Sequence, residues 1–332
     1  MKMSINIKRS NMNKKFYSVI ASATIFVLLL SACAAPAATS KQIHVVASTT
    51  IVGDVVNKIG GEHIQLTVLF PVGADPHTFE PRPQDVAAIA DAKIIFLNGL
   101  ELEHSLENIL EANATGTIVE VSDGVEVLHF DGEHHEGEEE HHEGEEEQHE
   151  GEEHGHADGD PHTWMDPNLV MIWVNNIEAT LSELDPSNAA DYAANAKNYL
   201  AELTELDAWI QTEVAKVPVE NRKLVTDHHN MGYFIHRYEF ELAGLVIDSL
   251  STGASPSAQD LSALVDAIKE QNVKAIFVGS TVNPNLAEQI SSDTGTTLVT
   301  IDTASLGGEG SDTATYIEFM KKMVTAIVNG LQ

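Results

Sequence analysis

The sequence predicts an α/β protein of two lobes, each a mostly parallel β-sheet flanked by helices, joined by one long rigid helix. Three observations support this fold class. From residue 43 onward, short β-branched runs alternate with helical segments, which is typical of parallel sheets. The alternation resumes after Pro218. Between the two regions, a helical pattern over residues 188–217 would span roughly 40 Å at about 1.5 Å per residue.

Residues 1–33 have the pattern of a signal peptide. Basic residues precede an apolar run over 19–30, which is too short and too rich in small residues for a membrane span. The run ends in Leu30-Ser31-Ala32-Cys33, which resembles a bacterial lipoprotein processing box. We therefore expect cleavage before Cys33 and lipid attachment to it. Since Cys33 is the single cysteine, the chain can form no intrachain disulfide.

The N-terminal lobe is assigned to residues 34–187, which begin with a short tether of small and polar residues. Within it, β-branched runs predict strands, and apolar residues at helical spacing predict helices. Each crossover is about long enough to return the chain to a parallel neighbour. The expected strands are 43–47, 64–70, 94–98 and 117–121, and the expected helices are 52–59, 84–92, 101–112 and 168–184.

A stretch of low sequence complexity, residues 131–159, interrupts this lobe. Residues 131–160 hold fifteen carboxylates and no Lys or Arg. Such a composition cannot bury an apolar core, so we expect a flexible, solvated loop. The loop also carries histidines that could collect zinc weakly at several sites, and these form a candidate auxiliary metal loop: His134, His135, His141, His142, His149, His154 and His156.

The linking helix, 188–217, has apolar residues at helical spacing along its length. The C-terminal lobe, 218–332, follows Pro218 and repeats the alternation of strands and helices. Gly295 is well placed to end one of its helices. The expected strands are 223–226, 243–247, 275–279 and 297–301, and the expected helices are 257–271, 285–294 and 313–329.

The charge of the chain excludes one class of partner. Its 51 acidic and 18 basic residues give a formal net charge of −33. Nucleic-acid binding depends on Lys and Arg that neutralise phosphates, so we expect no nucleic-acid partner. A cationic ligand suits this balance better.

Three segments each place a histidine beside turn-forming residues at the expected C-terminal end of a strand. They are 70–81 with His77, 160–167 with His162, and 226–234 with His228. The first two share the tetrapeptide Asp-Pro-His-Thr. Ligands of open α/β sheets bind at this edge. Neutral imidazole is a preferred zinc ligand, and a carboxylate can complete a tetrahedron, so these histidines predict a metal site.

Taken together, these motifs resemble the metal-specific solute-binding proteins of ABC importers, the zinc and manganese group whose two lobes are joined by one rigid helix. The resemblance covers essentially the whole chain. It is carried by the lipoprotein box and by residues 73–81, 160–164, 228–234, 275–278 and 299–302.

The resemblance implies a ligand set of His77, His162, His228 and Asp302, which would hold the ion between the lobes. The third position tends to be histidine in zinc binders and glutamate in manganese binders of this family, so His228 implies zinc. Three imidazoles with one carboxylate suit four-coordinate zinc, whereas manganese favours oxygen-rich sites. His229 is the alternative to His228. Around residues 253–256 and 277–279, this chain has no acidic residue where relatives usually have one.

The resemblance implies a function that involves no catalysis. We expect an extracytoplasmic, lipid-anchored monomer, on the cell surface or the periplasmic face, that delivers Zn²⁺ to the permease and ATPase subunits of an ABC importer. Affinity should fall as the pH drops through about 6.5, the reference histidine value, because imidazole must be neutral to bind. The alternatives are a Mn²⁺- or Fe²⁺-binding protein, a surface adhesin or metal buffer of the same fold, and a zinc hydrolase. The sequence offers no HExxH helix and no assigned general base for the hydrolase.

Overall fold

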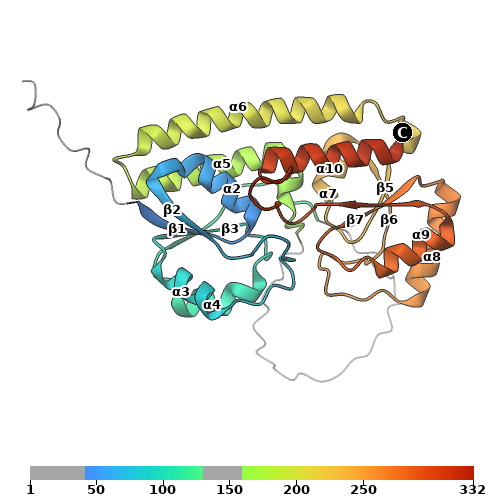
Figure 1. Cartoon of the computed structure of the whole chain (residues 1–332), viewed down its shortest axis with the longest axis horizontal. Coiled ribbons are helices and arrows are strands. Elements are labelled where there is room, and N and C mark those ends of the chain that lie inside the picture. Colours follow the sequence, from blue (N-terminus) through green and yellow to red (C-terminus); the bar gives the residue numbers. More distant parts are fainter. Residues whose placement is uncertain (1–41, 130–158) are drawn as a thin grey trace, which may run out of the picture. The chain divides into compact units, whose positions relative to one another are not determined.

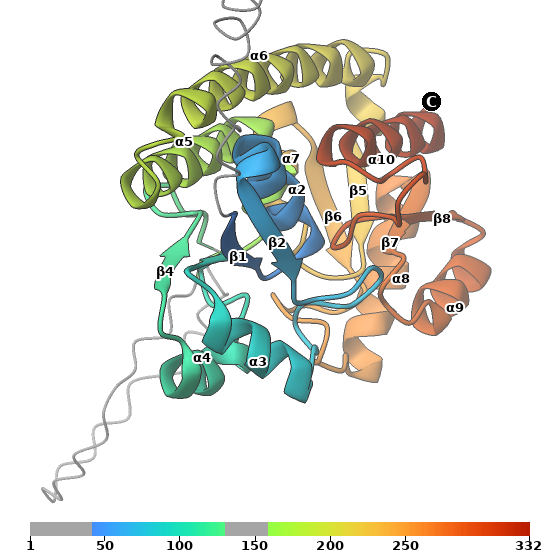
Figure 2. The same ribbon diagram turned by 60° about the vertical axis from the view of Figure 1, so that its left-hand side comes forward.

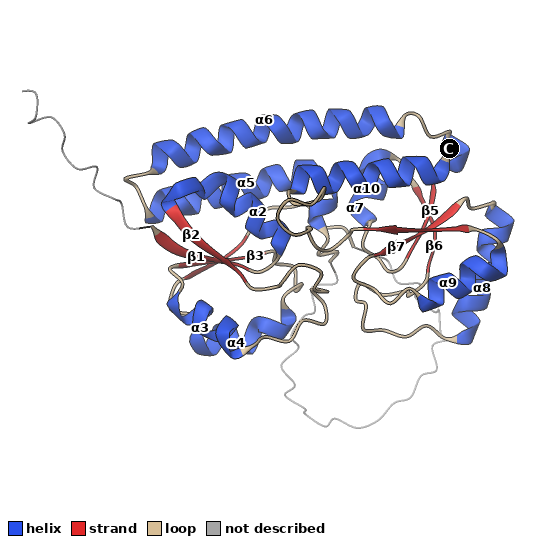
Figure 3. Ribbon diagram, in the orientation of Figure 1, coloured by secondary structure: helices blue, strands red, loops and turns tan. Residues whose placement is uncertain are grey.

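Two four-stranded parallel sheets organise the computed structural model, which describes residues 42–129 and 159–332 (Figure 1). The signal segment with Cys33, and the seven histidines between residues 134 and 156, lie outside the described residues. Helices cover both faces of each sheet (Figure 3). The predicted fold class is confirmed.

The first sheet has the strand order β2-β1-β3-β4, with every neighbouring pair parallel. Its first and third strands therefore lie side by side, and the connections on either side of them run in opposite directions. Such a switch point opens a crevice at the carboxyl ends of the strands. The strands are β1 (Ile43–Ala47), β2 (Ile64–Val68), β3 (Ile94–Leu97) and β4 (Thr117–Glu120).

The two faces of the first sheet contact different helices because side chains alternate along each strand. Val45 and Phe96 pack into the main core with α2 and α5, whereas Val46 and Ile95 pack with α3 and α4 on the opposite face. The central strands β1 and β3 are buried along most of their length on both faces, which explains their continuous apolar runs. The helices of this part are α2 (Thr50–Gly60), α3 (Pro83–Asp91), α4 (Glu107–Asn113) and α5 (Pro167–Leu184).

The second sheet repeats the strand order of the first, as β6-β5-β7-β8, again with parallel pairs. A second switch point therefore lies between β5 and β7. The strands are β5 (Lys223–Thr226), β6 (Glu241–Leu245), β7 (Ala275–Gly279) and β8 (Thr297–Ile301).

Side chains also alternate along β7, so the two faces of this strand contact different helices. Ala275 and Phe277 pack into the main core with α7 and α10, and Ile276 and Val278 pack with α8 and α9. Figure 2 shows α8 and α9 on one side of this sheet and α10 on the other. The helices are α7 (Gly232–Tyr238), α8 (Ala258–Gln271), α9 (Asn285–Thr294) and α10 (Tyr316–Leu331).

Helix α6 (Ala189–Val214) connects the chain segments that form the two sheets. Its 26 residues span roughly 39 Å at about 1.5 Å per residue. Asn195 bonds to the carbonyl of Ile59 in α2, and Asp207 bonds to Arg237 and Tyr238 in α7. The helix therefore contacts both parts of the fold. It is shorter at both ends than the predicted 188–217, and the division of the chain into lobes stays a prediction.

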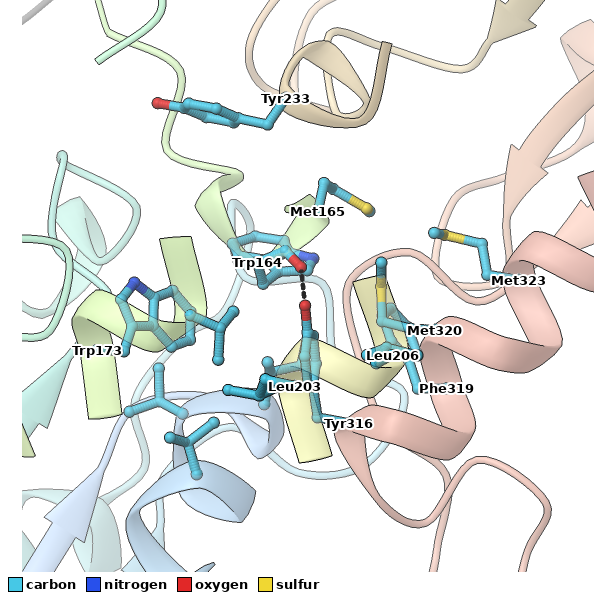
Figure 4. Packing of buried hydrophobic residues seen from close by; sticks show 14 of the residues in the cluster. Trp164, Met165, Trp173, Leu203, Leu206, Tyr233, Tyr316, Phe319, Met320 and Met323 are labelled. Atoms are coloured by element: carbon cyan, nitrogen blue, oxygen red, sulfur yellow. Dashed lines mark hydrogen bonds between the residues drawn. The ribbon is translucent and has the colours of Figure 1, made fainter. Parts of the chain in front are cut away.

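One apolar core runs through both halves. Figure 4 shows Trp164 and Trp173 beside residues of α6 and α10, with the Tyr316 hydroxyl donating to the carbonyl of Trp164 at 2.7 Å. Tyr316 opens α10, so the C-terminal helix packs against the chain around His162. This shared core sets the distance between the two carboxyl edges.

Sequence patterns misplaced some boundaries. The segment 98–103, expected to begin the helix 101–112, is a turn in which Leu100 and Glu101 have positive φ, and a 3₁₀ turn precedes α4. Buried Glu103 stabilises this turn by accepting the amides of Asn98 and Gly99 at 2.7 and 3.2 Å. β6 begins two residues earlier than expected. The short 3₁₀ helices are Gly61–His63, His104–Leu106, Thr163–Met165 and Val219–Asn221.

Candidate metal centre

His77 lies in a proline-rich loop between β2 and α3. Gly73 takes a positive φ, and the amide of Ala74 bonds to the carbonyl of Pro71, so the chain turns sharply. Asp75 then accepts the backbone N–H of His77 at 3.0 Å through Oδ1. This Asx turn fixes the backbone from which the His77 ring projects.

His162 occupies the second copy of the same tetrapeptide, directly before a 3₁₀ turn. Asp160 Oδ1 accepts the backbone N–H of His162 at 2.9 Å and contacts its Nδ1 at 2.7 Å. Both side chains are buried. A bond from Nδ1–H to Asp160 places the proton on Nδ1 and leaves the Nε2 lone pair for a ligand.

His228 follows β5 and comes from the second sheet. Asp227 Oδ1 accepts the backbone N–H of His228 at 3.0 Å, while Oδ2 accepts the amide of Gly279 at 3.0 Å. His228 Nδ1 lies 3.2 Å from Asp227 Oδ1, but this contact is not aligned as a hydrogen bond. Both ring nitrogens of His228 are thus buried without a hydrogen-bond partner. A buried polar group in this state is costly unless a ligand satisfies it.

The three histidines converge. One ring nitrogen of each histidine lies within 4.8 Å of a ring nitrogen of each of the other two. His77 Nε2 and His162 Nε2 are 3.1 Å apart, and the ring centroids are separated by 5.2 to 5.4 Å. Two nitrogens at about 2.0–2.1 Å from a tetrahedral ion would be about 3.3–3.4 Å apart. The spacing therefore suits a small transition-metal ion with little rearrangement.

Burial holds the rings of His77 and His162 in the neutral form. Burial, followed by the neighbouring His162 and His228, lowers the pKa of His77 to about 3. Burial and His228 also lower the pKa of His162. Both rings therefore stay neutral well below pH 6.5, and the expected loss of affinity near that pH does not come from His77 or His162.

Asp302 is not part of the cluster. It follows β8, where Ser280 Oγ donates to its Oδ1 at 2.7 Å and Lys322 Nζ lies 3.9 Å from its Oδ2. To bind an ion beside the three histidines, its carboxylate would have to leave Ser280 and Lys322. Its assignment as the fourth ligand stays a prediction.

The structure brings His228, rather than His229, to the other two histidines. His229 Nε2 contacts Asp248 Oδ1 at 2.8 Å instead. The auxiliary histidines of the 131–159 loop and the lipid-attachment residue Cys33 lie outside the described residues. Within the described residues, no helix is long and apolar enough to cross a membrane.

Three aspartates fix the backbones of these histidines and were not among the predicted site residues, namely Asp75, Asp160 and Asp227. The sequence does contain a pattern that could have identified them, since an aspartate stands one or two residues before each histidine. Gly279 also has a role, because a Cβ there would lie 2.6 Å from Thr303 Oγ1 and 2.9 Å from Asp227 Oδ2. A larger residue at this position would have to displace Thr303 or Asp227, so glycine here lets Asp227 reach the amide at the end of β7.

Comparison with known proteins gives a consistent result. The family described as zinc-uptake complex component A, periplasmic, matches residues 45–330. A manganese-binding lipoprotein, MntA, of Halalkalibacterium halodurans is 34% identical over 291 residues, covering 87% of this chain and 88% of that protein. The manganese ABC transporter substrate-binding lipoprotein PsaA of Streptococcus mitis is 30% identical and covers 93% of this chain and 98% of its own length.

Solved structures agree on the fold. A Mn-bound periplasmic metal-binding protein from Candidatus Liberibacter asiaticus has a TM-score of 0.73 at 25% identity, covering 88% of this chain and 100% of its own. The periplasmic zinc-binding protein TroA from Treponema pallidum has a TM-score of 0.75 at 24% identity, covering 88% and 99%.

Two sheets of equal strand order, a helix that contacts both, and a buried histidine cluster between their carboxyl edges define a metal-binding substrate-binding protein of the ABC-transporter type. Such a protein works with permease and ATPase components and is not an enzyme, which removes the hydrolase alternative. The chain belongs to the zinc-uptake complex component A family.

Proposed function

We propose that this chain captures Zn²⁺ between its two lobes and delivers it to the permease and ATPase subunits of an ABC importer. The proposed ligands are His77, His162 and His228, with Asp302 as the fourth after it leaves Ser280. The observation that carries the proposal is the all-imidazole cluster, in which the described residues place no carboxylate oxygen. Nitrogen-rich sites suit zinc, whereas manganese prefers oxygen ligands.

Manganese is the second candidate, because two similar proteins are named for it. An oxygen-richer site would require Asp302, water or another group to join the histidines. The two metals therefore predict different numbers of oxygen ligands at one site. Iron(II), like manganese, would require an oxygen ligand in addition to the histidines.

Three further proposals concern the context of the site. Cys33 would carry the lipid that anchors a monomeric protein on the outer face of the cell membrane. The histidine-rich loop would collect zinc near the site. The lobes would comprise residues 34–187 and 218–332, with 188–217 between them.

The test is competition for a calibrated chelator by the chain lacking residues 1–33, with zinc and with manganese, alongside His228→Ala. We expect one tight zinc site and at least about a hundredfold weaker binding in the variant, since it loses one of three imidazoles. His229→Ala is the matched control, because the adjacent ring contacts Asp248 instead. A preference for manganese would overturn the zinc proposal, and wild-type affinity in His228→Ala would overturn the ligand set.

Transport needs a separate measurement. Loss of zinc uptake in cells lacking the gene, restored by the wild-type chain and not by His228→Ala, would support delivery to an importer. Unchanged uptake would favour a surface adhesin or a metal buffer of the same fold.

A further inference from the structure

The loop that carries His77 is tied to the second half of the fold at two points. This segment, residues 71–81, is called the His77 loop. The amide of Gly73 donates to Ser305 Oγ at 2.9 Å, and the Thr252 hydroxyl donates to Asp75 Oδ2 at 2.5 Å. Ser305 follows β8 and Thr252 follows β6, so both partners belong to loops at the carboxyl edge of the second sheet.

Asp75 uses its two carboxylate oxygens for different partners. Oδ1 accepts the backbone N–H of His77, and Oδ2 accepts the Thr252 hydroxyl. Hydrogen bonds to an ionised carboxylate are short and stronger than neutral ones. Because the carboxylate is planar and rigid, a displacement of Thr252 turns both oxygens and moves the amide of His77. Asp75 therefore links the backbone of His77 to a side chain in the loop that follows β6.

The His77 ring differs from the other two histidine rings in having no carboxylate of its own turn beside it. Asp160 bonds to the ring of His162, and Asp227 lies 3.2 Å from the ring of His228. Within the described part of the chain, no carboxylate lies at ion-pair distance from the His77 ring. His77 is also partly exposed, whereas His162 and His228 are 1% and 2% exposed. His77 is therefore the ring of the cluster that solvent reaches most easily.

We propose that Thr252, acting through Asp75, is a positioning residue for His77, and that the Thr252–Asp75 hydrogen bond limits the rate at which the bound ion leaves. This inference rests on the proposed metal-binding function and adds a determinant of release to it. Separation of the two sheets during delivery would break this bond and withdraw His77 from the ion. Capture is less dependent on the bond, because Asp160 and Asp227 still fix the backbones of His162 and His228.

The experiment measures zinc dissociation from the chain lacking residues 1–33, by stopped-flow mixing with excess chelator. Thr252→Val keeps the shape of the side chain and removes the hydroxyl, so we expect dissociation about tenfold faster, with the association rate little changed. Thr252→Ser retains the hydroxyl and should restore the wild-type rate to within about twofold. Ser305→Ala leaves Asp75 in place and should change the rate only about twofold.

Further variants distinguish this positioning role from a general loss of structure. Thr281→Val makes the same substitution on a different loop of the second half and should dissociate like wild type. Equal dissociation rates for Thr252→Val and wild type, with faster release from His77→Ala, would overturn the positioning role and leave the metal site standing. Equally fast release from Thr252→Val and Thr252→Ser would also overturn it, since the hydroxyl would then be irrelevant. A wild-type chain that binds no zinc would overturn both proposals.

Discussion

Two tetrapeptides of this chain have the same sequence but make different contacts. They are Asp75-Pro76-His77-Thr78 and Asp160-Pro161-His162-Thr163. In both, the aspartate accepts the backbone N–H of the histidine two residues later. In the second copy the same oxygen also contacts the histidine ring, deep in the core. In the first, the aspartate turns its other oxygen to Thr252 across the fold. The motif therefore fixes the backbone in both places, and its surroundings decide whether the ring is also fixed.

The largest effect expected from this difference is that of Asp160→Asn. The variant keeps an amide oxygen near His162 but loses the charge that orients and polarises the ring. Partners of metal-binding histidines typically contribute 10–100-fold to affinity, so we expect zinc binding to weaken by about 30-fold. Chelator competition measures this, with a thermal melt to verify folding. Wild-type affinity would show that burial alone holds the ring.

The same substitution in the other copy, Asp75→Asn, should cost less. The amide oxygen can still accept the backbone N–H of His77, and the amide nitrogen can donate to the Thr252 hydroxyl. We expect zinc affinity to fall by about threefold, measured in the same competition assay. If Asp75→Asn weakened binding more than Asp160→Asn, the comparison between the two copies would be reversed.

The third prediction concerns the pH dependence of folding without metal. His77 has a folded pKa of about 3, below the unfolded value of about 6.5, so its contribution to stability is present above pH 6.5 and is lost as the pH falls toward 3. His162 behaves similarly, but burial raises the pKa of its partner Asp160 to about 7, and proton uptake there opposes the loss. Among residues 42–129 and 159–332, no carboxyl group lies against the His77 ring in this way.

We therefore expect His77→Gln to flatten the decline in unfolding free energy between pH 6.5 and 4, by up to about 1.4 kcal/mol per pH unit. Urea denaturation in the presence of a chelator measures the slope. His236→Gln, on an exposed part of α7, is the control. A slope identical to that of wild type would mean that His77 is not buried neutral in the metal-free protein.

The sequence predicts the fold well because the alternation of strand and helix patterns can be recognised from neighbouring residues alone. Strands such as β7 are apolar on both faces, and the helices between strands have apolar residues at their own spacing. The three histidines are also recognisable, since each follows a strand beside turn-forming residues. This much requires no knowledge of which segments meet.

What the sequence could not supply depends on contacts between distant segments. Thr252 is one polar residue among several in a loop, and its bond to Asp75 spans 177 positions. Glu103 resembles a solvated helix residue, yet it is buried beneath Asn98 and Gly99, so the predicted helix start at 101 was wrong. Asp302 follows its strand as expected, but Ser280 and Lys322 compete for its carboxylate.

The smallest expected effect on zinc affinity lies away from both tetrapeptides, at Asp207 of α6. Burial opposes ionisation there, but hydrogen bonds from Arg237 and Tyr238 outweigh it and lower the pKa of Asp207. A lowered carboxyl pKa contributes stability above the unfolded value of about 3.9, and this contribution is lost as the pH falls through the folded value. Asp207→Asn should thus destabilise the fold at pH 7, and the difference from wild type should shrink in acid.

We expect the cost at pH 7 to be about 1 kcal/mol, because Arg237 is 37% exposed and solvent screens the pair. Zinc affinity should stay within about twofold of wild type, since Asp207 contacts none of the three histidines. Urea denaturation at pH 7 and pH 4, paired with chelator competition, measures both. A large loss of zinc affinity would mean that the contact between α6 and α7 positions His228, and the two tetrapeptides would then not be the main determinants of the site.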